Sequence, residues 1–218
     1  MTATISLMNM SSLFHVFLQR APLCIAALAL VFFAAGCSAD YTPQEGDIAF
    51  QSLPHNAIID TIEGSTGSPF SHCGILHQVG TEWKVIEAIG PVKETSVTAW
   101  EMQGRDGRFT VYRLKSKYRD KIPAFIKAAQ GYEGLPYDIH YDLDDKAIYC
   151  SELIYKAFRK ATGEELGRLQ KLSELKWEPY VAVIKQFEGG VVPLDRLLIT
   201  PRSMSEATQL EKVFEESK

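Results

Sequence analysis

The first 36 residues differ so strongly in charge from the rest of the chain that they restrict where a folded domain can lie. Of 23 Lys and Arg side chains only Arg20 precedes residue 37, and none of the 27 Asp and Glu side chains does. Residues 21–36 are uncharged and mostly apolar, and this run is shorter than the about 20 residues that a membrane-spanning helix needs. These features are typical of a signal peptide, so residues 1–36 are excluded from the folded domain.

The apolar run ends in Ala34-Ala35-Gly36-Cys37, small residues followed directly by a cysteine. This motif resembles the lipobox of bacterial lipoproteins, in which cleavage precedes the cysteine and the thiol receives a diacyl lipid. The resemblance implies an exported protein held in the bacterial envelope through Cys37, with residues 37–45 as a tether. Ser38 resembles lipoproteins of the outer membrane that face the periplasm. A plain cleaved signal and an uncleaved anchor are the alternatives.

The remaining 182 residues carry 22 basic and 27 acidic side chains, a net charge of −5. A nucleic-acid-binding protein would usually show a basic excess, so we expect no nucleic-acid partner. The length and an apolar fraction of 46% suit one globular domain with its own core.

Four cysteines have different expected fates. Cys24 leaves with the signal peptide and Cys37 is lipidated, so the folded part keeps Cys73 and Cys150. Two cysteines cannot form a disulfide scaffold, although an oxidising compartment would permit a single Cys73–Cys150 bond. We expect Cys73 to be a buried thiol instead.

Residue patterns predict short strands in one part of the chain and helices around them, which favours an α+β fold over an alternating α/β fold. The expected strands are residues 47–50, 72–79, 83–89 and 109–114, and the expected helices are residues 55–63, 96–103, 118–132 and 148–162. Residues 64–69 should end the first helix. Residues 205–218 are expected to form a C-terminal surface helix.

Cys150 opens the best-defined helix of the sequence, Tyr149-Cys150-Ser151-Glu152. The unpaired N–H groups and the dipole at a helix N-terminus favour a thiolate, which is the nucleophilic form of cysteine. A thiolate nucleophile needs a basic partner, normally a histidine that is oriented by a third polar group.

Hairpin geometry selects His72 among the histidines. If Gly80-Thr81 forms a two-residue turn, Gly74 lies opposite Glu87, and His72 is the diagonal neighbour of Glu87 on the same face. Diagonal cross-strand neighbours lie about 7–8 Å apart, within reach of two long polar side chains. Alternation sends Cys73 and His77 to the opposite face, so His72 and Glu87 are predicted to pair.

Five stretches occur in an order that resembles the YiiX/YaeF-like permuted papain-like hydrolases of the NlpC-type superfamily. They are GDIAF (46–50), SPFSHCGI (68–75), VIEA (85–88), GLPYD (134–138) and DDKAIYCSELIYKAF (144–158), and PLDRLLITPRSM (193–204) fits as well. The resemblance covers residues 46–204, which we take as the hydrolase domain.

The resemblance implies a circularly permuted papain-like fold, with a central antiparallel sheet packed against the helix that bears the nucleophile. It implies Cys150 as nucleophile, His72 as general base and acid, and Glu87 as the residue that orients His72. The backbone N–H of Cys150 is expected to stabilise the oxyanion, with Tyr41, Tyr149 and Ser151 as further oxyanion or substrate-binding residues. The expected reaction is cleavage of an amide or ester bond through an acyl-enzyme.

Substrates and competing functions remain open at this stage. A peptidoglycan peptide and an acyl lipid are the candidate envelope substrates, and Trp100, Tyr132 and Tyr137 are candidate cleft residues. An inactive papain-like binding module and a lipid acyltransferase-like enzyme are the alternatives. We expect neither metal nor cofactor. Strand alternation places Cys73 on the face opposite His72 and no CxxC companion exists, and the acidic run 138–145 lacks the Gly and Glu of a calcium-binding loop.

Overall fold

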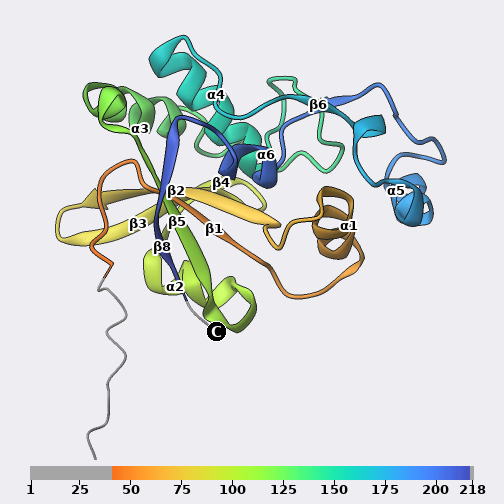
Figure 1. Ribbon diagram of the computed structural model, residues 1–218, viewed down its shortest axis with the longest axis horizontal. Helices are drawn as coiled ribbons and strands as arrows, with labels where there is room; N and C mark the ends of the chain where they lie inside the picture. The colour runs from red at the N-terminus through yellow and green to blue at the C-terminus, as the bar shows by residue number, and fades with distance from the viewer. Residues whose placement is uncertain (1–40, 217–218) are drawn as a thin grey trace, which may run out of the picture. The chain divides into compact units, whose positions relative to one another are not determined.

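A computed structural model describes residues 41–216, which form one compact unit. Its strands and helices follow the chain in an order that Figure 1 shows. They are β1 (Ile48–Gln51), α1 (Ala57–Thr66), β2 (His72–Val79), β3 (Glu82–Ala88), β4 (Val92–Ser96), α2 (Val97–Gln103), β5 (Phe109–Leu114), α3 (Ile122–Gln130), α4 (Cys150–Thr162), β6 (Gln170–Lys171), α5 (Val181–Phe187), β7 (Leu197–Leu198), α6 (Pro201–Ser205) and β8 (Leu210–Glu215). Short 3₁₀ helices span Arg105–Gly107, Ser116–Lys121, Leu172–Glu174 and Glu178–Tyr180.

A six-stranded antiparallel sheet in the order β4-β3-β2-β1-β5-β8 forms the centre of the fold. Helices α3 and α4 cover one face and α2 lies on the other (Figure 1). Alternation along the strands divides the core accordingly. Ile48, Phe50 and Ile75 pack in the larger cluster with α3 and α4, whereas Ala49 and Leu76 pack in a smaller cluster with Trp100 of α2. The predicted α+β class is confirmed.

The β2–β3 hairpin has the predicted register. Val79 pairs with Glu82 and Gly74 pairs with Glu87, around a turn in which Gly80 has φ 63°. Gly74 is required here because a Cβ at this position would lie 2.3 Å from Val85 Cγ1 and 3.0 Å from the carbonyl oxygen of Ile86. The close approach of the two strands therefore depends on a residue without a side chain.

The prediction of a C-terminal helix is wrong. Residues 210–215 form β8, which pairs with β5 at one end of the sheet, and the nearest helix, α6, ends at Ser205. Leu210 belongs to the larger hydrophobic cluster and Phe214 packs against the smaller one. Pairing with β5 and this packing therefore outweigh the helical tendency of the segment.

Two further boundaries differ from the sequence prediction. Helix α1 continues through Gly64 and ends at Thr66, with Gly67 as its C-cap. Gly64 leaves room for Tyr180, because a Cβ at this position would lie 1.6 Å from the Tyr180 hydroxyl. The helix expected over residues 118–132 is a 3₁₀ turn followed by α3. Strand β4 was not predicted, because Val92–Ser96 lacks a long apolar alternation.

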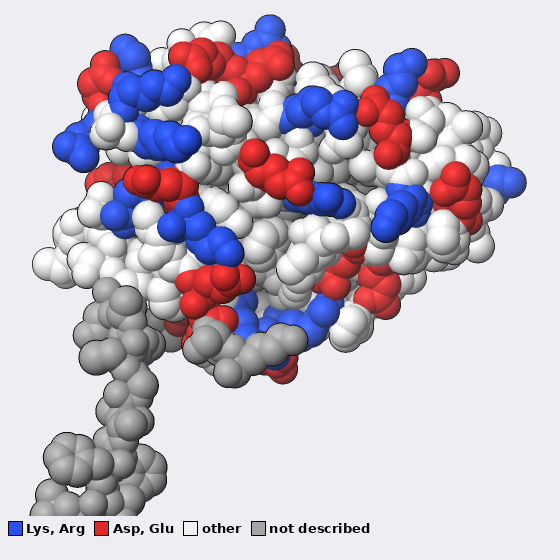
Figure 2. Space-filling model, in the orientation of Figure 1, with Lys and Arg blue, Asp and Glu red and all other residues white. Residues whose placement is uncertain are grey.

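The expected signal peptide, Cys24, the lipobox with Cys37 and the start of the tether lie outside the described residues. Within residues 41–216 no helix is both long and apolar enough to cross a membrane. On the face shown in Figure 2, Lys and Arg side chains are interspersed with Asp and Glu side chains, in agreement with the small net charge of the chain.

Candidate active site

Cys150 is the first residue of α4, as predicted. Tyr149 has extended backbone and precedes the helix, and its N–H donates to Glu152 Oε2 at 3.3 Å, which closes the first turn. Cys150 is only 3% exposed and lies against the sheet. The helix N-terminus favours a thiolate, whereas burial by itself disfavours it, so that ionisation of Cys150 depends on its neighbours.

His72 and Glu87 form the predicted pair. His72 Nε2 lies 2.6 Å from Glu87 Oε2, and both side chains are almost completely buried. His72 is the first residue of β2 and lines the same cleft as Cys150. Glu87 thus holds one ring nitrogen of His72 and leaves the other, Nδ1, available to Cys150.

The second carboxylate oxygen of Glu87 is held by two residues that sequence reasoning missed. Thr95 Oγ1 donates to Glu87 Oε1 at 2.6 Å, and Gln103 Nε2 donates to it at 3.2 Å. Thr95 belongs to β4 and Gln103 ends α2. Trp100 of the same helix packs near the His72 ring, with 6.2 Å between ring centroids. Thr95 was missed because β4 was not predicted. Gln103 was missed because the sequence predicted helix α2 but not where that helix lies relative to Glu87.

Electrostatics favour a thiolate–imidazolium pair. The hydrogen bond from Cys73 and the charge of His72 lower the pKa of Cys150 well below its usual value, although burial opposes this. Burial alone would lower the pKa of His72, but Cys150 and Glu87 raise it to about 9. His72 and the hydrogen bonds from Thr95 and Gln103 lower the pKa of Glu87, although burial acts in the opposite direction. These shifts favour the thiolate form of Cys150 and the protonated form of His72.

Cys73 is a buried free thiol, as predicted, and Cys150 is free as well, so no disulfide joins them. The face that Cys73 occupies is, however, the face covered by α4, so that its thiol interacts directly with Cys150. Burial and the adjacent Cys150 raise the pKa of Cys73 well above its ordinary value. Cys73 therefore stays protonated and can donate to the Cys150 thiolate.

Tyr149 and Ser151 line the cleft, but their hydroxyls are used to fix another segment. Ser151 Oγ donates to the Ile199 carbonyl at 2.9 Å, and the Ile199 N–H donates to the Tyr149 hydroxyl at 3.0 Å. These bonds hold the residues after β7 against the start of α4. Their side chains position the cleft wall, and the backbone N–H of Cys150 at the helix start remains the expected oxyanion donor.

Tyr41 does not belong to the site, contrary to expectation. Its hydroxyl donates to Asp47 Oδ2 at 2.7 Å, and its ring stacks on Phe214 in the smaller hydrophobic cluster. Proximity in sequence to β1 does not bring it to the cleft, because its ring packs among the residues on the face of the sheet opposite α4. Trp100 and Tyr132 do not line the cleft either, whereas Tyr137 does. Burial, Tyr141 and Cys150 raise the pKa of Tyr137 well above its ordinary value, so its hydroxyl stays protonated.

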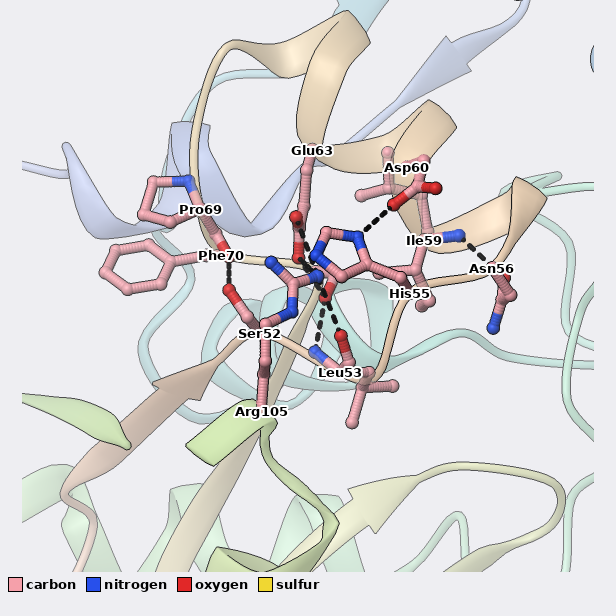
Figure 3. Close-up of polar contacts among 12 residues, drawn as sticks. Ser52, Leu53, His55, Asn56, Ile59, Asp60, Glu63, Pro69, Phe70 and Arg105 are labelled. Atoms are coloured by element: carbon pink, nitrogen blue, oxygen red, sulfur yellow. Dashed lines mark hydrogen bonds and ion pairs between the residues drawn. The ribbon is translucent and has the colours of Figure 1, made fainter. Parts of the chain in front are cut away.

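A network of polar contacts fixes helix α1 at the side of the cleft (Figure 3). Arg105 Nη2 donates to the Leu53 carbonyl at 2.9 Å and to Glu63 Oε2 at 3.0 Å, while Ser71 Oγ donates to Glu63 Oε1 at 3.0 Å. Asn56 caps the helix by accepting from the N–H groups of Ile58 and Ile59 at 2.9 and 3.0 Å. The network thus ties Leu53, in the β1–α1 connection, and Glu63, on α1, to Arg105, and ties Glu63 to Ser71 just before β2.

The geometry defines a class of protein: a thiol hydrolase of papain-like type, in which a strand histidine, oriented by an acid, faces a cysteine at a helix N-terminus and precedes it in the chain. Comparison with known proteins agrees. The model of the permuted papain-like amidase family YaeF/YiiX, C92, matches residues 42–214, so the chain belongs to this family of cysteine hydrolases.

Two relatives show how far the similarity extends. The Escherichia coli K12 protein YiiX is 32% identical over 179 residues, which cover 81% of this chain and 88% of YiiX. A crystal structure of YiiX from Escherichia coli O157:H7, described as a metalloprotein, superimposes with a TM-score of 0.76 at 33% identity. The superposition covers 82% of this chain and 100% of the YiiX chain. Within residues 41–216 of this chain, no three His, Cys, Asp or Glu side chains lie close enough together to hold a metal ion.

Proposed function

We propose that this protein is an envelope-anchored cysteine amidase, held by a lipid on Cys37, in which Cys150, His72 and Glu87 carry out the reaction. The observation that supports it best is the placement of His72 between Glu87 and Cys150 in a buried site that opens into a cleft. The substrate is an amide, or a related ester, of the cell envelope.

Acylation begins with attack of the Cys150 thiolate on the carbonyl carbon. The backbone N–H of Cys150 stabilises the oxyanion, and the protonated hydroxyl of Tyr137 is a second donor at the cleft wall. As the tetrahedral intermediate collapses, the C–N bond breaks and His72 gives its proton to the leaving nitrogen. Cys150 is left as a thioester and His72 as a neutral base.

Deacylation reverses the role of His72. The neutral imidazole takes a proton from water, the hydroxide attacks the thioester carbonyl, and the C–S bond breaks to release the acid. Cys150 returns to the thiolate and His72 to the imidazolium, while Glu87 keeps the ring oriented and stabilises its charge. Transfer of the acyl group to an amine or alcohol instead of water would make the protein an acyltransferase.

The pH dependence of alkylation tests the proposed ion pair. Iodoacetamide should label Cys150 of the full-length protein already at about pH 6, because His72 keeps the thiol ionised below its usual pKa of about 8.5. In His72→Gln the labelling rate at that pH should fall at least about tenfold and recover only as pH rises toward an ordinary thiol pKa. Peptide mapping distinguishes Cys150 from the buried Cys73.

Turnover completes the test. Hydrolysis of N-acyl aminocoumarin amides should be abolished in Cys150→Ala and in His72→Gln. In the wild type it should decline as pH rises above about 9, where His72 loses its proton. Products formed with an added amine distinguish hydrolysis from acyl transfer. A wild-type Cys150 that titrates as an ordinary thiol and turns over no amide or ester would favour the inactive binding module and contradict the proposal.

A further inference from the structure

The side chains of Cys73 and Cys150 are direct neighbours, although the two residues are far apart in the sequence. Cys73 belongs to β2, and strand alternation turns its side chain toward the face of the sheet that α4 covers (Figure 1). Cys150 begins α4, and its sulfur is hydrogen-bonded to both the thiol and the backbone N–H of Cys73. Disulfides form between cysteines whose side chains are already neighbours, and this pair meets that condition.

The two thiols differ in their access to small molecules. Cys150 lines the cleft, whereas Cys73 does not line it and is completely buried in the larger hydrophobic cluster. A reagent that enters the cleft therefore meets Cys150 first. Cys73 is protected from the reagent itself but remains in contact with the sulfur that reacts.

The two thiols also differ in ionisation. The hydrogen bond from Cys73 and the neighbouring His72 lower the pKa of Cys150, whereas burial and Cys150 raise the pKa of Cys73. A thiolate is the form of cysteine that hydroperoxides oxidise, and a second thiol in contact with the oxidised sulfur captures it as a disulfide. The pair thus has the arrangement of a redox-sensitive cysteine beside a resolving cysteine.

Packing alone does not require a sulfur atom at position 73. A buried cysteine usually acts as a small apolar side chain, and alanine or valine serves the same purpose in the core of a sheet. A thiol placed against the nucleophile adds one capacity that neither of these residues provides, which is the formation of a covalent bond to Cys150.

We propose that Cys73 is the resolving cysteine of a reversible redox switch, in which a hydroperoxide converts Cys73 and Cys150 into a disulfide. Formation of this bond depends only on the two thiols, whereas its effect on catalysis rests on the proposed function. The disulfide occupies the Cys150 sulfur, so that no thiolate is left to attack a carbonyl carbon. The envelope location proposed above is an environment in which disulfides persist.

Oxidation takes place in two steps. The Cys150 thiolate attacks the terminal oxygen of the hydroperoxide, the O–O bond breaks, and the departing oxygen takes the proton of His72, which leaves Cys150 as a sulfenic acid. The Cys73 sulfur then attacks the Cys150 sulfur, the S–O bond breaks, and the Cys73 proton leaves with the hydroxide as water. The two sulfur atoms together lose two electrons, which the O–O bond gains. A dithiol reverses the reaction by thiol–disulfide exchange and restores both thiols.

Peptide mapping of the full-length protein after treatment with hydrogen peroxide tests the switch. The treatment should join the peptides that contain Cys73 and Cys150, lower their summed mass by about 2 Da and abolish iodoacetamide labelling of Cys150. Dithiothreitol should restore both the labelling and the turnover of amides. Proteolytic cleavage after Glu63 separates Cys73 from Cys24 and Cys37, so that the joined peptides identify the bond.

Two substitutions remove the resolving thiol in different ways. Cys73→Val keeps an apolar side chain in the core, and Cys73→Ser keeps a hydrogen-bond donor to Cys150, so either serves if the other does not fold. In both, hydrogen peroxide should carry Cys150 on to the sulfinic acid, a gain of about 32 Da, and dithiothreitol should no longer restore labelling. Recovery is compared within each variant before and after treatment, so a change in its basal activity does not affect the readout.

Cys150→Ala is the matched control. Its Cys73 is buried and stays protonated, so this thiol should remain free under the same treatment. Recovery of labelling in the Cys73 variants, or oxidation of wild-type Cys150 while Cys73 stays a free thiol, would overturn the proposal and leave Cys73 as a packing residue. A reversible Cys73–Cys150 disulfide in a protein that hydrolyses no amide or ester would support the switch chemistry and contradict the proposed function.

Discussion

At the residue scale, the contact of Glu87 with Nε2 of His72 determines which ring nitrogen is left to face Cys150. The two oxygens of Glu87 accept from three different side chains, one each from β2, β4 and α2. A carboxylate held in this way cannot rotate without breaking several buried hydrogen bonds, each of which is costly to leave unsatisfied. In the proposed reaction, Thr95 and Gln103 therefore act through Glu87 as positioning residues.

Replacement of Glu87 by Gln should reduce kcat by about 10–100-fold, less than loss of Cys150, because the reacting groups remain while the imidazolium loses its compensating charge. The alkaline limit of the pH profile should move to lower pH than in the wild type, since the charge of Glu87 helps to raise the pKa of His72 to about 9.

Glu94→Gln is the matched control for this variant. Glu94 pairs with the buried His77 at 3.2 Å, and neither residue lines the cleft. The Glu94→Gln substitution should leave the pH profile unchanged. A Glu87→Gln enzyme with the wild-type profile would contradict the assigned role.

Local rules of sequence explain why some of these residues could be predicted. A two-residue turn at Gly80-Thr81 and the period of two along a strand determine which side chains share a face, so His72 and Glu87 could be paired from the sequence. Alternation also separated Cys73 from His72 correctly. It could not show that α4 would cover the face of Cys73, because that contact depends on packing between distant segments.

At the scale of elements, the position of α1 relative to the sheet determines the width of the cleft. The helix buries little apolar surface of its own, with Ile59 its only almost fully buried aliphatic side chain. Polar contacts therefore contribute much of its attachment. Arg105, from the 3₁₀ turn after α2, links it to the β1–α1 connection through Glu63 and Leu53 (Figure 3).

Arg105→Gln should lower the free energy of unfolding by about 1–3 kcal/mol, because Glu63 loses a charge-assisted hydrogen bond in a partly buried place. It should also raise KM for N-acyl aminocoumarin amides, because the α1 wall of the cleft is displaced. Urea denaturation and steady-state kinetics provide the two measurements.

Arg108→Gln is the control for this variant, because its ion pair with Asp106 is largely exposed and such pairs contribute about 0–1 kcal/mol. Equal effects of the two substitutions on stability and on KM would show that the Arg105–Glu63 pair does not hold the wall.

For the whole molecule, the proposed location in the envelope rests on the N-terminal segment. If Cys37 is the lipidated residue, Cys37→Ala should abolish incorporation of an alkyne fatty acid in cells and release the protein from the membrane fraction. Cys24→Ala should change neither, because residue 24 lies in the predicted signal peptide. Mass spectrometry of the mature N-terminus checks both. A chain that retains its first residues, or incorporates the label without Cys37, would contradict the anchor.

Several features of this protein follow from its sequence alone, because they depend on neighbours along the chain. The α+β class, the hairpin register, the helix that begins at Cys150 and the family resemblance all rest on local periodicity, turn residues and ordered motifs. The charge pattern before residue 37 likewise predicts an exported protein from composition alone.

The tertiary structure decided the features that depend on segments far apart in sequence. The strand β8 in place of a helix, the contact of Cys73 with Cys150, and the support of Glu87 by Thr95 and Gln103 all arise from non-local packing. The apolar cleft is the clearest case, because α1 and α5 are more than 100 residues apart. Neither helix has a pattern that shows which surface its apolar side will face, and only the folded chain places both beside Cys150.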